Sequence, residues 1–364
     1  MRDAASTMKK AIEDLNYQHF DCFLHKIALA VNDATEHRTK AVVDVKKQIQ
    51  ICRELVAFYN RSSEFQRTLL RQQQLIDAPQ NILIRDVPTR WNSILTMFNR
   101  LVEQQRSLLI ASVEYNNVVL PDFELLKKIS KILQPFADKT EKLSSRNECI
   151  SSILPTYKYL LACLAENALD STIEKEMKQV ISNGLKNRME EHTDKSFLVI
   201  ATLVDPRYKN KGSIFNAAQR MRNRLLICSE IVQCLNPVNA RSPAHSFVNG
   251  ENNDDPMGQF LSASCEEEHL ATNLVDYPNV EEEVDAYFKA STEKLTIDPI
   301  EFWKNSSMYP NLKKIAKIYL SCPPSSVESE RTFSRLSSIE NFKRSRLTSQ
   351  HAKEQLFLLF NFDE

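Results

Sequence analysis

The sequence predicts a mainly α-helical protein, and three observations support this prediction. Only four glycines occur in 364 residues, whereas β-rich folds use glycine in the turns between their strands. Apolar residues recur at helical spacing over most of the chain. Hydrophobic residues make up 42% and charged residues 26%, as in a soluble protein with a buried core. This length is sufficient for two ordinary domains or for one domain with a large insertion.

Charge and cysteine usage narrow the class of protein. The 47 Lys and Arg residues balance the 47 Asp and Glu residues, so nucleic-acid binding would need a local patch. The eight cysteines form no Cys-x-x-Cys pair, which favours free thiols in a reducing compartment. MRDAASTMKK has no apolar signal core, and FLVIATLV is too short to cross a bilayer. We expect an intracellular protein with no membrane partner and no small-molecule substrate.

The N-terminal quarter is predicted to contain helices and one strand. One helix extends to about Leu15, a second covers about 20–34, and a third opens after Thr39 with VVDVKKQIQICRELVAFY. NILIRDVP at 81–88 is short, aliphatic and closed by a proline. That pattern suits a buried strand over 82–86 better than a helix.

The middle of the chain is predicted to be helical up to a polar linker. Thr89 is expected to cap a helix over WNSILTMFNRLVEQQRSLLIASV, and Pro121 begins another over DFELLKKISKILQPF. From about Asn236 to Asn279, asparagine, proline, serine and acidic residues replace the helical pattern, which indicates a linker or disordered loop. Further helices are expected at about 149–168, 171–191 and 213–235.

Two strongly amphipathic helices are predicted near the C-terminus. Pro323 and Pro324 end the first, and Thr348 or Ser349 begins the last. Each carries one apolar stripe, which favours an interface between chains and a small bundle that a partner completes. The stripes consist of Leu312, Ile315, Ala316, Tyr319 and Leu320, and of Ala352, Leu356, Leu359 and Phe360.

The segment from Pro323 to Asn361, PPSSVESERTFSRLSSIENFKRSRLTSQHAKEQLFLLFN, resembles the dimerisation segment of hAT-type transposases over its whole length. It has the Pro-Ser-Ser opening, Ser-Glu-Arg-x-Phe-Ser, Arg-x-Arg-Leu and a Leu/Phe-rich closing helix. VEEEVDAYF, DPIEFWKN and NLKKIAKIYLSC resemble the start of the same segment. Three further stretches are similar to family motifs in the right order: DVPTRWNSILTMFNRL at 86–101, ATLVDPRYKNK at 201–211, and residues 2–31.

The resemblance is nearest to the zinc finger BED domain-containing type, whose members are domesticated transposases. It implies a truncated RNase H-like core, a large all-helical insertion and a C-terminal helical dimerisation segment. The expected divisions are a core remnant with flanking helices at 1–91, the helical insertion at 92–235, the polar linker at 236–278 and the dimerisation domain at 279–364.

The resemblance also implies which carboxylates belonged to a catalytic site. RNase H-like transposases resemble enzymes that hold two Mg²⁺ ions with three carboxylates. By motif, Asp3 matches the second acidic residue and Glu330 the third, while the first would lie upstream of Met1. Asp3 could instead favour a helix N-terminus. Glu330 has no basic residue at i±3 or i±4, so it needs a metal, a distant arginine or water. We expect no enzyme activity and no cofactor in this chain, and Mg²⁺ only with a complete core.

Candidate DNA contacts and metal ligands each have a structural alternative. Trp91 matches a tryptophan thought to stack on DNA bases, but it could equally anchor a core at a helix start. A basic cluster could contact phosphates or act as a nuclear signal, or it could be a solvated helix end. Cys22 and His25 have the spacing of half a zinc site, yet no second pair completes it, so we expect a packing role and no metal. The DNA-contact candidates are Arg90, Trp91, Arg331, Lys343, Arg344 and Arg346.

The predicted function is dimerisation in a transposase-derived nuclear protein. The partner would be a second copy or a related hAT protein, and DNA association would come through an upstream BED finger. Two alternatives stay open: a fragment of an active transposase that cleaves and transfers DNA strands with Mg²⁺, and a helical scaffold without a DNA role. The candidate dimerisation residues are Leu312, Ile315, Tyr319, Phe333, Leu336, Leu356, Leu359 and Phe360.

Overall fold

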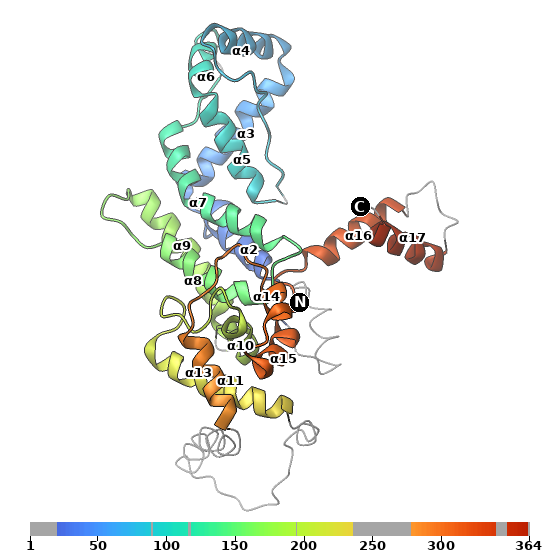
Figure 1. Cartoon of the computed structure of the whole chain (residues 1–364). Coiled ribbons are helices and arrows are strands. Elements are labelled where there is room, and N and C mark those ends of the chain that lie inside the picture. The colour runs from blue at the N-terminus through green and yellow to red at the C-terminus, as the bar shows by residue number, and fades with distance from the viewer. Residues whose placement is uncertain are drawn as a thin grey trace, which may run out of the picture. The chain divides into compact units, whose positions relative to one another are not determined.

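The computed structural model describes residues 20–88, 90–115, 118–193, 195–235, 278–339 and 348–362. Within these ranges the protein is mainly helical and contains no β-strand, as predicted for its class (Figure 1). None of the described helices is both long enough and apolar enough to cross a membrane. The chain forms two compact units. We call Phe23–Leu143 with Thr156–Glu191 the N-terminal unit, and Met1–Cys22, Ser144–Pro155 and His192–Glu364 the C-terminal unit.

The N-terminal unit is a helical bundle with an aromatic and aliphatic core. Helix α2 packs against α9, α7 and α3, and α5 packs against α7. Phe23, Phe98 and Phe136 are fully buried in this core. Its helices are α2 (Phe23–Thr35), α3 (Val43–Arg61), α4 (Ser63–Leu75), α5 (Asn92–Glu103), α6 (Gln105–Ser112), α7 (Phe123–Leu143), α9 (Thr172–Met189) and most of α8 (Ile153–Cys163).

Helices α2 and α9 approach closely because a glycine faces the contact. A Cβ atom at Gly184 would lie only 3.4 Å from the Cα of Ala30. Two buried charges join the same helices: Arg188 donates to Asp33 Oδ2 at 2.7 Å, and Lys26 Nζ donates to the Arg188 carbonyl at 2.7 Å. The contact pairs a helix before the predicted 92–235 insertion with one inside it. The compact units therefore differ from the predicted division at residue 91.

The prediction of a strand at 82–86 is wrong. Residues 78–87 are extended but irregular, and Leu83 is buried. Side chains from neighbouring helices take the place of a strand partner. Gln73 Nε2 donates to the Asn81 carbonyl at 2.9 Å, and an Arg100 guanidinium nitrogen donates to the Ile82 carbonyl at 2.6 Å. An aliphatic run closed by proline is consistent with such a buried segment as well as with a strand.

The helix predicted to start at Thr89 divides into α5 and α6 at Gln104. The Gln104 side chain is fully buried, accepts a hydrogen bond from Gln73 Nε2 at 2.8 Å and donates to the Pro79 carbonyl at 2.8 Å. These bonds hold the backbone of Gln104 outside the helical range, at φ −89° and ψ 8°. Thr89 itself and the helix predicted before residue 20 lie outside the described residues.

The C-terminal unit surrounds one apolar helix, α10 (Ser196–Val204). This is the aliphatic stretch FLVIATLV, and its residues from Leu198 to Val204 are all buried. A 3₁₀ turn (Ile150–Ser152), α11 and α15 pack against it. The other helices are α11 (Ala217–Leu235), α13 (Pro278–Lys289), α14 (Pro299–Asn305), α15 (Pro310–Tyr319), α16 (Val327–Ile339) and α17 (Ser349–Phe362). The predicted linker lies outside the described residues except for Pro278, which begins α13.

Helix α9 begins with a reciprocal cap at Ser171. The Ser171 hydroxyl accepts a hydrogen bond from the Glu174 amide at 3.4 Å, and the Glu174 carboxylate accepts one from the Ser171 amide at 2.9 Å. The Ser171 side chain and amide, followed by Lys128, lower the pKa of the Glu174 carboxyl. This contribution to stability is present above the ordinary pKa of glutamate and is lost as the pH falls through the lowered value.

We predict that Ser171→Ala lowers the free energy of unfolding of the N-terminal unit by about 1 kcal/mol, the usual effect of removing a helix cap. Urea unfolding followed by circular dichroism measures this difference. Ser171→Thr keeps the hydroxyl at the cap and should stay near the wild-type value. Equal losses in both variants would show that the cap hydrogen bond is not the cause.

Candidate functional site

The last two helices hold five of the residues predicted to mediate dimerisation. Helices α16 and α17 pack on each other (Figure 1). Helix α17 also presents two large apolar side chains to solvent, since Phe357 is 63% and Leu358 is 53% exposed. Side chains of this kind are available for contact with another protein. Phe333, Leu336, Leu356, Leu359 and Phe360 occupy positions on these helices, but their side chains lie outside what the structure describes.

The other three candidates belong to the chain's own core, so the expectation that they line an interface between chains is corrected. Leu312 and Ile315 are fully buried, and Tyr319 is 8% exposed. Helix α15 directs this stripe against α10 and α11. Tyr319 donates a hydrogen bond to Glu230 Oε1 on α11 at 2.7 Å. An amphipathic pattern predicts that a face is covered, but not whether the cover is the same chain or another one.

Two aromatic side chains attach α13 and α14 to the end of α10. The Val204 carbonyl accepts hydrogen bonds from Tyr287 Oη at 3.0 Å and from Trp303 Nε1 at 2.8 Å. Both rings are almost fully buried, and their centroids lie 5.4 Å apart. Val204 is the last residue of α10, where carbonyl groups have no partner within the helix. The two donors therefore satisfy a buried acceptor and fix two helices at the same point.

Lys209, in the loop that follows α10, attaches this loop to the C-terminal end of α13. Its ammonium group donates to the carbonyls of Tyr287 at 2.9 Å, Ala290 at 3.0 Å and Ser291 at 2.9 Å. It also lies 4.4 Å from the centre of the Tyr287 ring. A cation is favourable at the negative end of a helix dipole, and the aromatic face adds a further attraction. These contacts explain how a lysine that is 4% exposed remains stable inside the unit.

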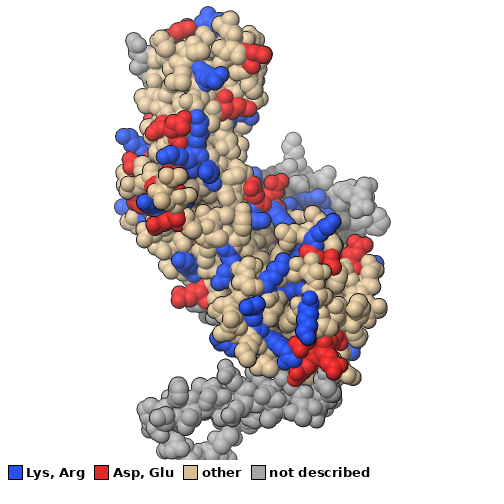
Figure 2. All heavy atoms as spheres, turned by 60° about the vertical axis from the view of Figure 1, so that its left-hand side comes forward, with Lys and Arg blue, Asp and Glu red and all other residues tan. Residues whose placement is uncertain are grey.

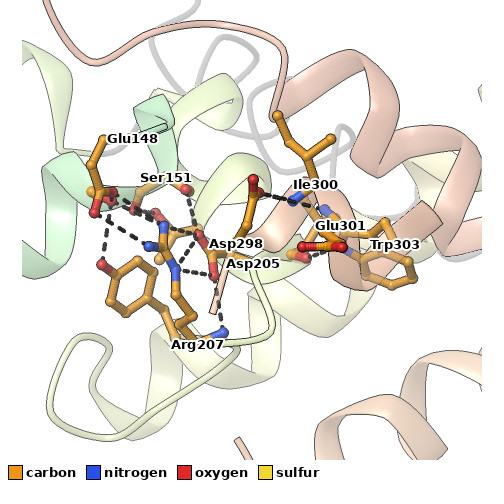
Figure 3. Close-up of polar contacts among 12 residues, drawn as sticks. Glu148, Ser151, Asp205, Arg207, Asp298, Ile300, Glu301 and Trp303 are labelled. Atoms are coloured by element: carbon orange, nitrogen blue, oxygen red, sulfur yellow. Dashed lines mark hydrogen bonds and ion pairs between the residues drawn. The ribbon is translucent and has the colours of Figure 1, made fainter. Parts of the chain in front are cut away.

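A buried ion network holds the loop that carries Lys209 (Figure 3). Arg207 Nε donates to Asp205 Oδ1 at 3.0 Å, and its guanidinium also contacts Glu148 Oε1 at 3.3 Å. Ser151 Oγ donates to Asp205 Oδ2 at 2.6 Å. All four residues are buried. Because each charge has a hydrogen-bonded partner, the desolvation cost of the network is offset and the loop after α10 has a fixed geometry.

The ionisation of this cluster favours a structural role over a catalytic one. Burial lowers the pKa of Arg207, but hydrogen bonding and charge from Asp205, with a further contribution from Glu148, outweigh it and raise the pKa. Burial is the main cause that raises the pKa of Cys149 to about 12 and that of Tyr208 to about 12. The thiol and the phenol therefore stay protonated at neutral pH, whereas an acid, base or nucleophile works best with a pKa near that pH.

In the N-terminal unit, Asp86 anchors the segment that precedes α5. Arg53 Nε donates to both oxygens of Asp86 at 3.0 Å, and the same guanidinium contacts Glu36. Asp86 is only 5% exposed. The Ser93 hydroxyl accepts a hydrogen bond from the Val87 amide at 2.8 Å, which closes the turn before the helix. The stretch similar to the Thr-Arg-Trp-Asn-Ser motif is thus held at both ends.

Trp91 and Arg90 lie together in this segment and stay candidates for DNA contact. Trp91 precedes the first residue of α5 and is half-buried, and Arg90 is exposed. Partial burial is consistent with both roles considered for Trp91, a core anchor and a surface that stacks on DNA bases. Pro88 lines a pocket of about 580 Å³ to which Lys46 and Lys47 also contribute. Arg53 and Glu36 line the same pocket, so Lys46 and Lys47 give it an excess of positive charge.

Of the two expected catalytic carboxylates, only Glu330 lies in the described part of the chain. Glu330 is exposed in the first turn of α16, and Ser326 Oγ donates to its Oε1 at 2.8 Å. Of the three environments expected for this carboxylate, exposure to solvent is the one that the structure shows. Asp3 lies outside the described residues. Among the residues that the structure describes, no group of His, Cys, Asp and Glu side chains is arranged to hold a metal ion.

Of the remaining candidates for DNA or metal contact, those that the structure describes have ordinary structural environments. Arg331 forms an ion pair with Glu328, which also lies 3.4 Å from Arg146 Nε. Cys22 is buried, and its Sγ accepts a hydrogen bond from the Ser326 amide at 3.5 Å, whereas His25 is exposed. The basic residues Lys343, Arg344 and Arg346 lie outside the described residues.

Sequence reasoning noted the stretch LVDPRYK but missed what it does. The signal was present, since two cations and a tyrosine closely follow a mostly apolar helix. Charges at that position must be exposed or paired with buried partners. The partners could not be identified, because Tyr287 and Trp303 are about 80 to 100 residues away along the chain.

Two regions of the chain match known protein families. Residues 283–362 match the hAT family C-terminal dimerisation region. Residues 20–134 match the ZBED1 RNase-like helical domain. The first match contains the anchor residues Tyr287 and Trp303 as well as α16 and α17 up to its last residue. The second covers the larger part of the N-terminal unit.

Curated relatives are similar along almost the whole chain. Human zinc finger BED domain-containing protein 4 is 24% identical over 98% of this chain and 30% of its own length. Human zinc finger BED domain-containing protein 6 is 24% identical over 99% of this chain and 39% of its own length. The putative transcriptional regulator tpeD of Talaromyces stipitatus is 25% identical over 94% of this chain and 41% of its own length. The chain thus spans about a third of the length of these relatives.

We predict that Lys209→Met lowers the free energy of unfolding of the C-terminal unit by about 1–3 kcal/mol, because the buried Tyr287 carbonyl loses its donor. Equilibrium unfolding in urea measures the loss. The matched control is Lys294→Met, which removes an exposed ammonium group from the same unit and should change stability by less than about 0.5 kcal/mol. A Lys209→Met protein as stable as this control would contradict the role of Lys209.

Proposed function

We propose that this chain, whose residues 283–362 match the hAT family C-terminal dimerisation region, pairs with a second copy of itself or with a related hAT protein. The pairing surface lies on α16 and α17. Helices α13, α14 and α15 serve a different purpose, which is to fasten this surface to the core of the C-terminal unit.

The observation that carries the proposal is the contrast between the two halves of the matched region. In the first half the large apolar side chains are covered within the chain: Tyr287 and Leu312 are fully buried and Trp303 is 2% exposed. In the second half, Leu358 is 53% exposed in the last helix. Burial of apolar area is the main driving force of association, and a lasting dimer buries roughly 2,000 Å² or more. An isologous contact would place α17 of both copies at the same interface.

A nuclear role with DNA association belongs to the same proposal. Two of the relatives are named zinc finger BED domain-containing proteins and one is named a putative transcriptional regulator. Arg90, Trp91 and the pocket beside Lys46 and Lys47 are the part of the N-terminal unit suited to such a contact. A BED finger in the same longer protein would supply the main DNA affinity, and the N-terminal helices would derive from an RNase H-like transposase.

We propose no strand-cleaving activity for this chain. The carboxylate of Glu330 is exposed and hydrogen-bonded by Ser326, so it has a satisfied environment without a metal. The alternative of an active transposase is tested by a Mg²⁺-dependent nuclease assay on a longer form that also carries the first acidic residue. Cleavage that Glu330→Gln abolishes would establish the alternative.

We predict that Leu358→Asp prevents pairing, because a carboxylate would have to be buried in an apolar contact. Sedimentation equilibrium measures the mass over a range of concentrations. The wild-type chain should approach twice its 42.0 kDa mass, whereas Leu358→Asp should stay at the monomer mass. Since Leu358 is exposed, the circular dichroism spectrum of the folded chain should be unchanged.

The matched control is Gln350→Asp, which adds the same charge at an exposed position of the same helix and should leave pairing intact. A wild-type chain that remains a monomer at every concentration would falsify the proposal. A dimer that both substitutions leave unaffected would place the interface elsewhere than α17.

A further inference from the structure

A stretch of the C-terminal unit carries positive charge without any carboxylate. Residues 206–229 contain no aspartate or glutamate, although the whole chain is neutral. Figure 2 shows Lys and Arg side chains gathered on a face of this unit, with Asp and Glu side chains mainly toward its edge. The cations of the stretch are Arg207, Lys209, Lys211, Arg220, Arg222 and Arg224.

Three of these cations have structural partners. Arg207 is paired with Asp205, and Lys209 donates to backbone carbonyls. Arg224 is paired with Asp285 at 2.7 Å. Lys211, Arg220 and Arg222 differ from them, because all three are exposed and form no side-chain hydrogen bond or ion pair within the described ranges. They therefore remain available to a ligand.

Lys211 and Arg220 meet a third cation, Lys289, at a pocket. Lys211, Arg220 and Lys289 line a cavity of about 290 Å³ at the end of α13. Lys289 is also exposed and makes no hydrogen bond or ion pair to another described residue. Asp285 lies in the same wall, but its carboxylate is already engaged by Arg224. The pocket thus has an excess of positive charge, and such an excess attracts anions.

The neighbouring charges are close enough to affect one another. Burial lowers the pKa of Lys209, Glu293 raises it, and the charge of Lys211 lowers it again. Repulsion between two ammonium groups is relieved when an anion lies between or beside them. The pocket also contains the half-buried ring of Phe288, which lies beside the cations and offers an apolar face.

We propose that this pocket binds one nucleotide unit of a single-stranded nucleic acid. Lys211, Arg220 and Lys289 would contact the phosphate, and the Phe288 ring would contact the base. Cations next to an aromatic face are the combination that single-stranded nucleic acids use, since each unit of the strand presents both a phosphate and a flat base. A phosphorylated peptide would use the cations but not the aromatic ring. The site is separate from the pairing surface on α17, so the inference does not depend on dimerisation.

The test measures fluorescence anisotropy of a labelled oligodeoxythymidylate of about 16 nucleotides with the full chain, over a range of KCl concentrations. The variant Lys211→Ala/Arg220→Ala/Lys289→Ala should bind at least about tenfold more weakly. Its log–log dependence on salt should be less steep by about 0.7, the contribution of one phosphate contact on a single strand. Phe288→Leu should weaken binding by about fivefold or more with an unchanged salt dependence.

The matched control is Arg67→Ala/Lys131→Ala/Lys186→Ala, which removes the same charge from exposed side chains of the N-terminal unit and should bind like the wild type. A conservative variant, Lys211→Arg/Arg220→Lys/Lys289→Arg, should retain most of the affinity, and circular dichroism verifies the fold of each protein. The proposal is overturned if the wild-type chain does not bind the strand, or if the two alanine triples lose equal affinity. It is also overturned if the pocket triple loses binding only to vesicles of anionic lipid or to a phosphorylated peptide.

Discussion

The C-terminal unit depends on how the backbone at the end of α10 is satisfied. A helix that is buried on all sides ends in carbonyl groups that neither water nor the helix itself can reach. Tyr287 and Trp303 fill this need at Val204, from two different helices. The hydrogen-bonding requirement of one short helix therefore decides where α13 and α14 attach. The chain continues from these helices to α16 and α17.

The loop after α10 reinforces this attachment with charge. Arg207 is held by Asp205 and Glu148, and two residues later Lys209 reaches the end of α13. Polar networks inside a core stabilise it only when every member has a partner. Because both cations here have theirs, the loop can be buried and still carry two positive charges. The same arrangement leaves Lys211, just beyond the buried part, exposed to solvent.

The local sequence pattern predicts most of the helices, but it does not predict which elements they pack against. The helical pattern over 171–191 predicts α9, and a proline-initiated run predicts α7. The segment around Leu83 was mistaken for a strand, because its carbonyls are satisfied by Gln73 and Arg100 rather than by a neighbouring strand. The apolar stripe of α15 was correctly placed on one face, but only the three-dimensional structure reveals that α10 covers it. Contacts between residues far apart in sequence carry no local signal.

The acceptor at Val204 has a consequence for how this chain can vary. A main-chain carbonyl is present whatever the side chain, so exchange of Val204 for another aliphatic residue cannot remove it. The donors are side chains, and only an indole or a phenol of the right reach can replace them. The two ends of the hydrogen bond therefore differ in which substitutions they tolerate. Val204 can change to another aliphatic residue and keep the acceptor, whereas Trp303→Phe removes the donor.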